Sequence, residues 1–162
     1  MQRYSFFPKS ESKVIFVLAT VCFTWTLTSL LRTVVDAVHF VPPGPGLFTV
    51  PGKPAMRVTD LLFFTPIIES LFLVAVIELI CWLHGPLWSQ ILGSTLVLAL
   101  LHSVGWKPWG LIVAPSFAIM AFSYHYWRSI SRKLAFSIVV CIHALHNLMP
   151  AISNLAYAIR HG

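Results

Sequence analysis

Residues that could carry chemistry lie inside stretches of this sequence that are otherwise strongly apolar. Glu69, His102 and His143 are ionisable, and an ionisable side chain at the centre of a membrane helix costs about 2.5 to 3.5 kcal/mol on insertion scales. Carboxyl and imidazole groups are the ones that proteins use to transfer protons and to ligate metals. A cost of this size predicts a function for these residues, either acid–base chemistry or metal binding.

Helical spacing and depth predict that these side chains meet. His143 and Asn147 are four residues apart and therefore lie on one face of a helix. At about 1.5 Å per residue, Glu69 lies about 13 Å below a membrane surface that His102 also approaches. Asn147 and His143 lie about 15 to 22 Å from the far end of their helix. We therefore expect all four side chains to converge in one layer.

Two neighbouring ionisable residues are given structural interpretations. Glu78 is nine residues from Glu69, which at about 100° per residue places the two on opposite faces of one helix. Only one of them can face a given site, and we favour Glu69 because it is nearer the middle of its span. His146 lies about 60° around the helix from His143, so it either flanks the site or binds a backbone carbonyl, and we favour the second.

The composition indicates that membrane-spanning helices carry these residues. Of 162 residues, 57% are hydrophobic and only 10% are charged, and the mean hydropathy is +0.82, whereas soluble domains have about a quarter charged residues. Apolar stretches of about 17 to 25 residues, enough to cross roughly 30 Å of hydrocarbon, recur along the chain. We predict an all-α, polytopic membrane helix bundle that forms a single transmembrane domain over residues 1–162, with five spans at about 14–35, 60–83, 87–104, 109–127 and 133–158.

Prolines punctuate this pattern. Residues 36–59 include five prolines and three glycines and are expected to form a loop along the membrane interface, either a linker or a lid over the site. Pro66 and Pro115 each remove a backbone hydrogen bond and favour a kink. Alternatively, Thr65 and Pro66 begin the second helix, which would then be about 18 residues long.

The tryptophans, the cysteines and the net charge are consistent with a membrane protein. Five tryptophans fall at or beside predicted span ends, where the indole ring prefers the headgroup layer: Trp82, Trp88, Trp106, Trp109 and Trp127. The three cysteines lie in different spans without metal-type spacing and are expected to be packing residues: Cys22, Cys81 and Cys141. The net charge of +6 suits anionic lipid headgroups and does not call for nucleic acid as a partner.

The order of the polar residues resembles the CAAX protease and bacteriocin-processing family, also called CPBP or Abi, of glutamic intramembrane proteases. The first motif of that family is Glu-Glu-x-x-x-Arg, usually after a proline and two apolar residues. Here "PIIESLFLV" supplies Pro66 and Glu69, while Ser70 and Val74 replace the second glutamate and the arginine.

The other two family motifs follow in the expected order. Phe-x-x-x-His appears as Leu98 to His102, so the histidine is present and the aromatic residue is not. His-x-x-x-Asn is intact as His143 and Asn147. The resemblance covers roughly residues 60–150, and the order and spacing of the motifs carry it.

The resemblance implies an endopeptidase that hydrolyses a peptide bond in a membrane-anchored or C-terminal tail substrate, as in members that process C-terminal sorting signals. Glu69 would act as general base on a water that His102 also holds, and His143 and Asn147 would donate hydrogen bonds to the oxyanion. It also implies a multi-pass protein of a prokaryotic cytoplasmic membrane. Its partners would be the bilayer and a membrane-protein or lipidated peptide substrate, with no cofactor, no metal and no nucleic acid.

Three alternatives remain open at this point. Glu69, His102 and either His143 or His146 could form a three-ligand zinc site. The replacements at the first motif also suit a noncatalytic membrane scaffold or immunity-type member of the family, in which the polar residues only pair helices. Paired membrane histidines could also hold haem.

Overall fold

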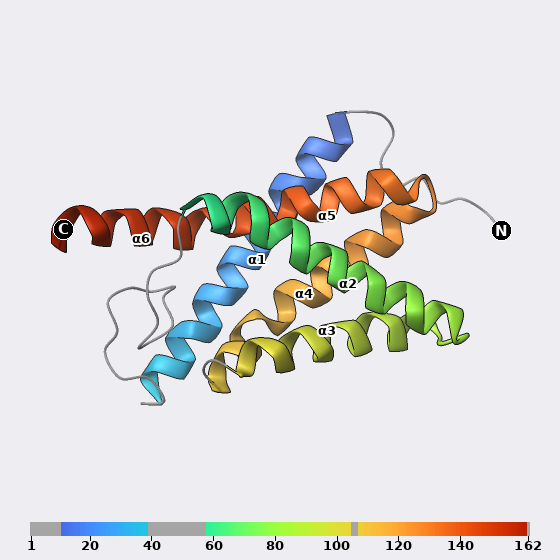
Figure 1. Cartoon of the computed structure of the whole chain (residues 1–162), viewed down its shortest axis with the longest axis horizontal. Helices are drawn as coiled ribbons and strands as arrows, with labels where there is room; N and C mark the ends of the chain where they lie inside the picture. Colours follow the sequence, from blue (N-terminus) through green and yellow to red (C-terminus); the bar gives the residue numbers. More distant parts are fainter. Residues whose placement is uncertain (1–10, 39–57, 105–106, 162) are drawn as a thin grey trace.

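The computed structural model describes residues 11–38, 58–104 and 107–161 (Figure 1). Helix is the only regular secondary structure in these ranges, which confirms the all-α prediction. In chain order the elements are α1 (Glu11–Ala37), the π-helix η1 (Asp60–Phe64), α2 (Thr65–Trp82), α3 (Leu87–Ser103), α4 (Lys107–Arg128), α5 (Arg132–His146) and α6 (Leu148–His161). Most of the predicted loop at 36–59, and Trp106, lie outside the described residues.

Three helical segments are long and apolar enough to cross a membrane: Lys13–Ala37, Asp60–Trp82 and Arg132–Ser153. Helix α3 is apolar but shorter. The bundle also buries polar side chains while large apolar ones face outward, as Ser94 and Thr28 are buried and Ile68 and Leu71 are exposed. So many exposed large apolar side chains are unusual in a soluble protein and suit a bundle surrounded by lipid.

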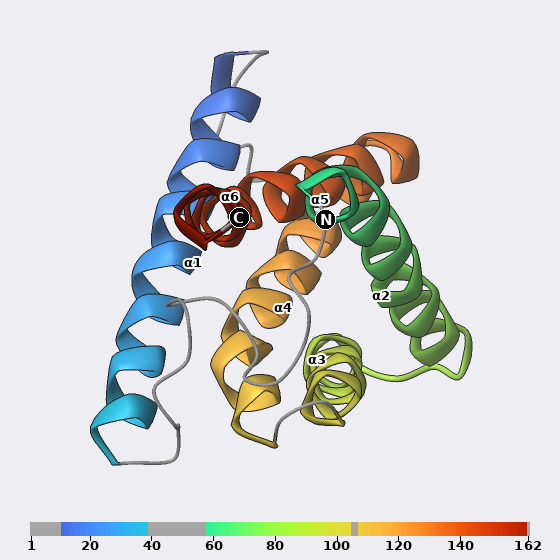
Figure 2. The ribbon, with the colours of Figure 1, turned by 60° about the vertical axis from the view of Figure 1, so that its left-hand side comes forward.

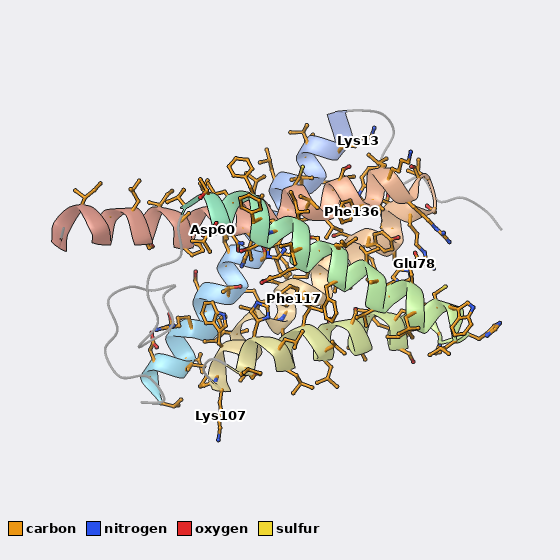
Figure 3. The ribbon with its side chains drawn as sticks, in the orientation of Figure 1. Lys13, Asp60, Glu78, Lys107, Phe117 and Phe136 are labelled. Carbon is orange, nitrogen blue, oxygen red and sulfur yellow. The ribbon has the colours of Figure 1, made fainter. Side chains whose placement is uncertain are left out.

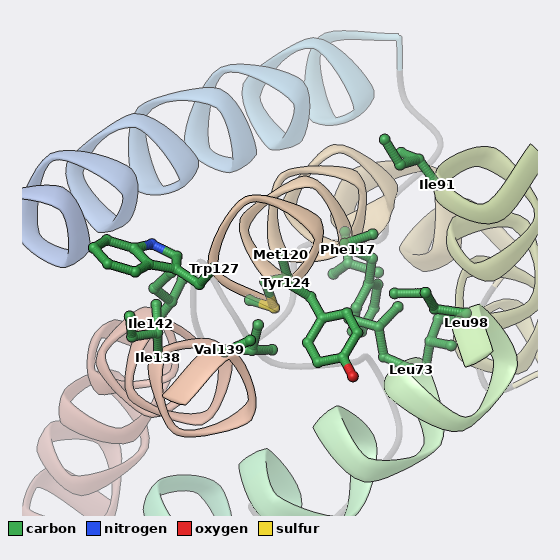
Figure 4. Close-up of a cluster of buried hydrophobic side chains, with 14 of the residues drawn as sticks. Leu73, Ile91, Leu98, Phe117, Met120, Tyr124, Trp127, Ile138, Val139 and Ile142 are labelled. Atoms are coloured by element: carbon green, nitrogen blue, oxygen red, sulfur yellow. The ribbon is translucent and has the colours of Figure 1, made fainter. Parts of the chain in front are cut away.

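Helix α4 lies at the centre of the bundle. It contacts α1, α2, α3 and α5, and Figure 2 shows it between α1 on one side and α2 and α3 on the other. The core around it is a continuous cluster of apolar side chains (Figure 4) that includes Leu73, Leu98, Phe117, Met120 and Val139. Helix α6 extends beyond this bundle (Figure 1).

The start of the second span combines features of both expectations for Pro66. Helix α2 begins at Thr65 with Pro66 in its first turn and has 18 residues, as the capping alternative predicts. Residues 60–64 are nevertheless helical and form the π-helix η1 rather than a loop. A proline ring collides with the carbonyl four residues earlier, and the wider π turn gives that carbonyl room.

A second proline interrupts the predicted fifth span. The structure divides residues 132–161 into α5 and α6 at Asn147, where the sequence predicts one helix. Pro150 has no N–H for the carbonyl of His146, four residues earlier. The indole Nε1–H of Trp25 donates to that carbonyl instead, at 2.9 Å, so a side chain of α1 replaces the missing backbone donor.

Two of the minor expectations are wrong. Trp127 is 3% exposed and packs edge-on against the rings of Phe16 and Tyr126, so it belongs to the core and not to an interfacial belt. Cys22 and Cys141 are exposed and therefore are not packing residues of the core. The burial of each of these side chains depends on which face of its helix packs against a neighbouring helix. The length of an apolar stretch does not indicate that face.

Gly110 marks the closest approach of α3 and α4 and gives a stability prediction. A Cβ atom there would overlap the Ala99 carbonyl and the Ser103 hydroxyl. Gly110→Ala should therefore lower the free energy of unfolding by about 1 to 3 kcal/mol, because backbone atoms cannot move aside cheaply. The measurement is the temperature at which the protein loses monodispersity in detergent.

Gly93→Ala is the matched control for this prediction. Its Cβ would meet only the end of the flexible Ile80 side chain, at 2.8 Å, and alanine favours helix by about 1 kcal/mol over glycine. We expect little change in stability. Equal losses at the two glycines would contradict a backbone clash at Gly110.

Candidate active site

The carboxyl group of Glu69 lies between two imidazole rings from different helices. Its Oε2 atom is 3.5 Å from Nε2 of His102 and 3.4 Å from Nε2 of His143. These residues come from α2, α3 and α5, so the structure brings together three of the four candidate residues. The side chains are 26%, 19% and 5% exposed in the order Glu69, His102, His143, which leaves the carboxyl group accessible and His143 fixed beneath it.

His102 is held in one tautomer by its own helix. Nδ1 lies 2.8 Å from the carbonyl oxygen of Leu98, and because a carbonyl only accepts, Nδ1 must carry the proton. The Nε2 of the neutral ring then presents a lone pair to the Glu69 carboxylate. Two acceptors cannot bond directly, so the pair needs either one added proton or a water molecule that donates to both. This is the property expected of an acid–base pair that acts on water.

His143 is oriented by Ser70, the residue that follows Glu69 in α2. Nδ1 of His143 is 3.4 Å from Oγ of Ser70, and both side chains are buried. When the hydroxyl donates to Nδ1, the ring proton resides on Nε2 and faces Glu69. Ser70 can thus fix an imidazole N–H towards the carboxyl group without adding a charge.

Phe117 of α4 is a site residue that sequence reasoning missed. Its ring centroid is 5.0 Å from that of His102 and 5.9 Å from that of His143, with the second pair edge-on. It is buried at the centre of the bundle (Figure 3) and limits the rotation of both imidazoles. Both imidazoles therefore pack against one aromatic ring that comes from another helix. Phe117 is one of 12 phenylalanines, and nothing in its local spacing distinguishes it.

Asn147, the fourth candidate, is bonded to the start of the second span. Its Nδ2 donates to the carbonyl oxygen of Leu61 in η1, at 3.0 Å, and its backbone N–H donates to the carbonyl of His143. Asn147 therefore lies one helical turn after His143. The hydrogen bond that the structure gives to its amide runs to the backbone and not to Glu69.

His146 connects α5 to α1. Its Nδ1 lies 3.1 Å from the hydroxyl of Thr24, and its carbonyl accepts the Trp25 indole N–H. The structure thus gives His146 a hydroxyl partner where the sequence favours a backbone carbonyl. Its contacts are with α1 and not with Glu69, so it has a packing role.

Glu78 lies in the second half of α2, far from Asp60 at the start of η1 (Figure 3), and has a separate set of contacts. Its carboxylate accepts the Tyr124 hydroxyl at 2.8 Å and pairs with Arg128 at 3.3 Å and Arg132 at 3.5 Å. The two glutamates, which the sequence predicts on opposite faces of one helix, therefore have different surroundings. Glu69 lies among histidines, and Glu78 lies among arginines.

Comparison with known proteins adds no family assignment. No family model, curated protein or solved structure matches the chain. The resemblance to the CPBP family therefore rests on the motif residues themselves and on their order. Among the residues that the structure describes, no group of three or more His, Cys, Asp and Glu side chains is arranged to hold a metal ion, so the zinc alternative gains no support from the geometry.

Proposed function

We propose that this chain is a multi-pass membrane protein, as in a prokaryotic cytoplasmic membrane, and an intramembrane glutamic endopeptidase of the CPBP type. Five segments would cross the bilayer: α1, η1 with α2, α3, α4, and α5 with the first part of α6. Its substrate would be a membrane-anchored protein or a lipidated peptide, cleaved in or near its C-terminal tail.

One observation carries the proposal. A partly exposed carboxylate has two imidazole Nε2 atoms within 3.5 Å, from two other helices. In a bundle that faces lipid with apolar side chains, this is an expensive arrangement, and acid–base chemistry on a water molecule is the use that the three groups fit together. The noncatalytic scaffold explains helix pairing, but it gives no reason for a second imidazole at the same carboxyl oxygen.

The mechanism follows from the protons that these groups can hold. Glu69, assisted by the His102 lone pair, takes a proton from a water molecule, whose oxygen attacks the peptide carbonyl carbon. The Nε2–H of His143 stabilises the resulting oxyanion. Glu69 then returns the proton to the leaving nitrogen as the C–N bond breaks, which gives one carboxylic acid and one amine.

Hydrolysis by water can be tested by isotope labelling. The purified protein is reconstituted in liposomes with synthetic peptides that contain one transmembrane segment and a short C-terminal tail, in H₂¹⁸O. We expect one ¹⁸O atom in each new carboxyl terminus, read by mass spectrometry. If a natively folded preparation cleaves no peptide in the set, the noncatalytic scaffold becomes the better explanation.

Chelation separates the glutamic mechanism from a zinc mechanism. With 1,10-phenanthroline present, we expect the cleavage rate to stay within about twofold of the untreated rate, because the proposed general base needs no metal to activate water. A rate that chelator abolishes and that added Zn²⁺ restores would show that a metal-bound water is the nucleophile.

A further inference from the structure

The carbonyl of Leu61 has lost its donors within its own helix. In the π register the N–H of Thr65 donates to Asp60, and the next residue, Pro66, has no N–H to give. Leu61 is 8% exposed, so an unpaired carbonyl here would be costly, most of all in a lipid surround. The sequence of η1 and α2 therefore creates a carbonyl that needs a donor from elsewhere.

Asn147 is that donor. Its Nδ2 lies 3.0 Å from the Leu61 oxygen, and its side chain is buried beside η1, with 9% of the residue exposed. His143 lies one turn earlier, within α5, and its imidazole contacts Glu69 and Ser70 of α2. The C-terminal end of α5 therefore contacts the second span at two levels. The Asn147 amide binds the start of that span at Leu61, and the His143 imidazole binds it about two turns further along, at Glu69 and Ser70.

We propose that Asn147 is a positioning residue that completes the proline-broken turn at Leu61 and so sets the distance between Glu69 and the two histidines. The hydrogen bond itself stands apart from any activity, whereas its catalytic consequence rests on the proposed peptidase function. This role differs from that of an oxyanion donor, because Asn147 acts through the backbone of η1 and not on the substrate.

A double-mutant cycle with Pro66 separates the two roles. Pro66→Ala restores an N–H that can reach the Leu61 carbonyl. Asn147→Ala should therefore lower kcat strongly in the parent protein, which has Pro66, and only slightly in the Pro66→Ala background. We expect Asn147→Ala to lower kcat about 10- to 100-fold with KM within about threefold, since a misplacement of the order of 1 Å has effects of this size. In the Pro66→Ala background the loss should shrink to below about threefold. Equal losses in both backgrounds would overturn the inference and favour direct contact of Asn147 with the substrate.

A spectroscopic measurement tests the hydrogen bond without any activity. Labelling leucine with both a ¹³C carbonyl and a ¹⁵N amide marks three Leu-Leu pairs, of which 61–62 is one. The Leu61 carbonyl resonance should move in Asn147→Ala and return towards its original position in the double variant. A resonance that does not move in Asn147→Ala overturns the inference, even if the parent protein cleaves peptides. A parent that cleaves nothing defeats the proposed function and leaves this readout intact.

Two further variants guard against an unfolded sample or a general loosening. Asn147→Leu removes the donor while keeping the number and branching of the side-chain heavy atoms, and it should reproduce the Asn147→Ala resonance. Glu78→Gln weakens contacts near the other end of α2, with Tyr124, Arg128 and Arg132, and should leave the Leu61 resonance unchanged. If Glu78→Gln moves the Leu61 resonance as far as Asn147→Ala does, the effect is global and the inference fails.

Discussion

Glu69→Gln is expected to abolish peptide cleavage, with a rate loss of about 10³-fold or more. Glutamine keeps the size of the side chain, can accept a hydrogen bond from the Nε2–H of His143 and can donate one to the His102 lone pair, but it cannot take a proton from water. General-base catalysis contributes about 10² to 10⁴ in rate, and here the same group must also return the proton to the leaving nitrogen. The measurement is the initial cleavage rate of a transmembrane peptide in liposomes at matched protein amounts.

Glu78→Gln is the control for this result, since it makes the same chemical change in the same helix. It weakens the contacts with Tyr124, Arg128 and Arg132, so the melting temperature should fall by a few degrees while kcat stays within about twofold. A Glu69→Gln protein that cleaves at the parent rate would remove the basis of the glutamic mechanism. Equal losses of rate in the two variants would trace the effect to folding.

His143→Ala is expected to lower kcat about 10²- to 10³-fold while the protein stays folded. Alanine removes the Nε2–H donor that lies 3.4 Å from the Glu69 carboxyl oxygen, and losing one oxyanion donor lowers kcat by about this factor. It also removes the partner of the Ser70 hydroxyl. Cleavage rate and thermal stability, measured on the same preparation, report the two consequences separately.

The neighbouring histidine supplies the comparison. His146→Ala removes the contact with Thr24 but leaves the backbone carbonyl that Trp25 uses. We expect kcat within about threefold of the parent value and a lower melting temperature. If His146→Ala lost as much activity as His143→Ala, the site would extend towards α1, and the separation of the two histidines by helical phase would be wrong.

Properties that are local in the sequence could be predicted from it. Apolar length indicated the helices, and the 100° helical increment separated Glu69 from Glu78, which now face histidines and arginines respectively. Depth along the helices placed His102 and His143 at the level of Glu69. Each of these inferences uses only positions along one helix, where geometry is fixed by the backbone hydrogen bonds.

Properties that depend on how helices pair could not be predicted. Phe117 reaches both imidazoles because α4 is central, and no periodicity in α4 shows which of its faces meets His102. The partner of Asn147 is a backbone carbonyl. A motif of side chains does not indicate which backbone carbonyl lies near a given residue. Trp127 was expected at a membrane boundary because of its place near a helix end, yet it is buried because α1 covers it.

The position of Glu69 around α2 has a consequence for how substrates arrive. The buried face of this helix carries Pro66, Ser70 and Leu73, while Ile68 and Leu71 are exposed to the surroundings, and Glu69 lies on the border between the two faces. A peptide diffusing sideways in the bilayer would meet the carboxyl group at the edge of the bundle, without any pair of helices having to part. We therefore expect turnover to follow the mole fraction of substrate in the lipid, so that adding empty lipid at constant volume slows cleavage by dilution in two dimensions.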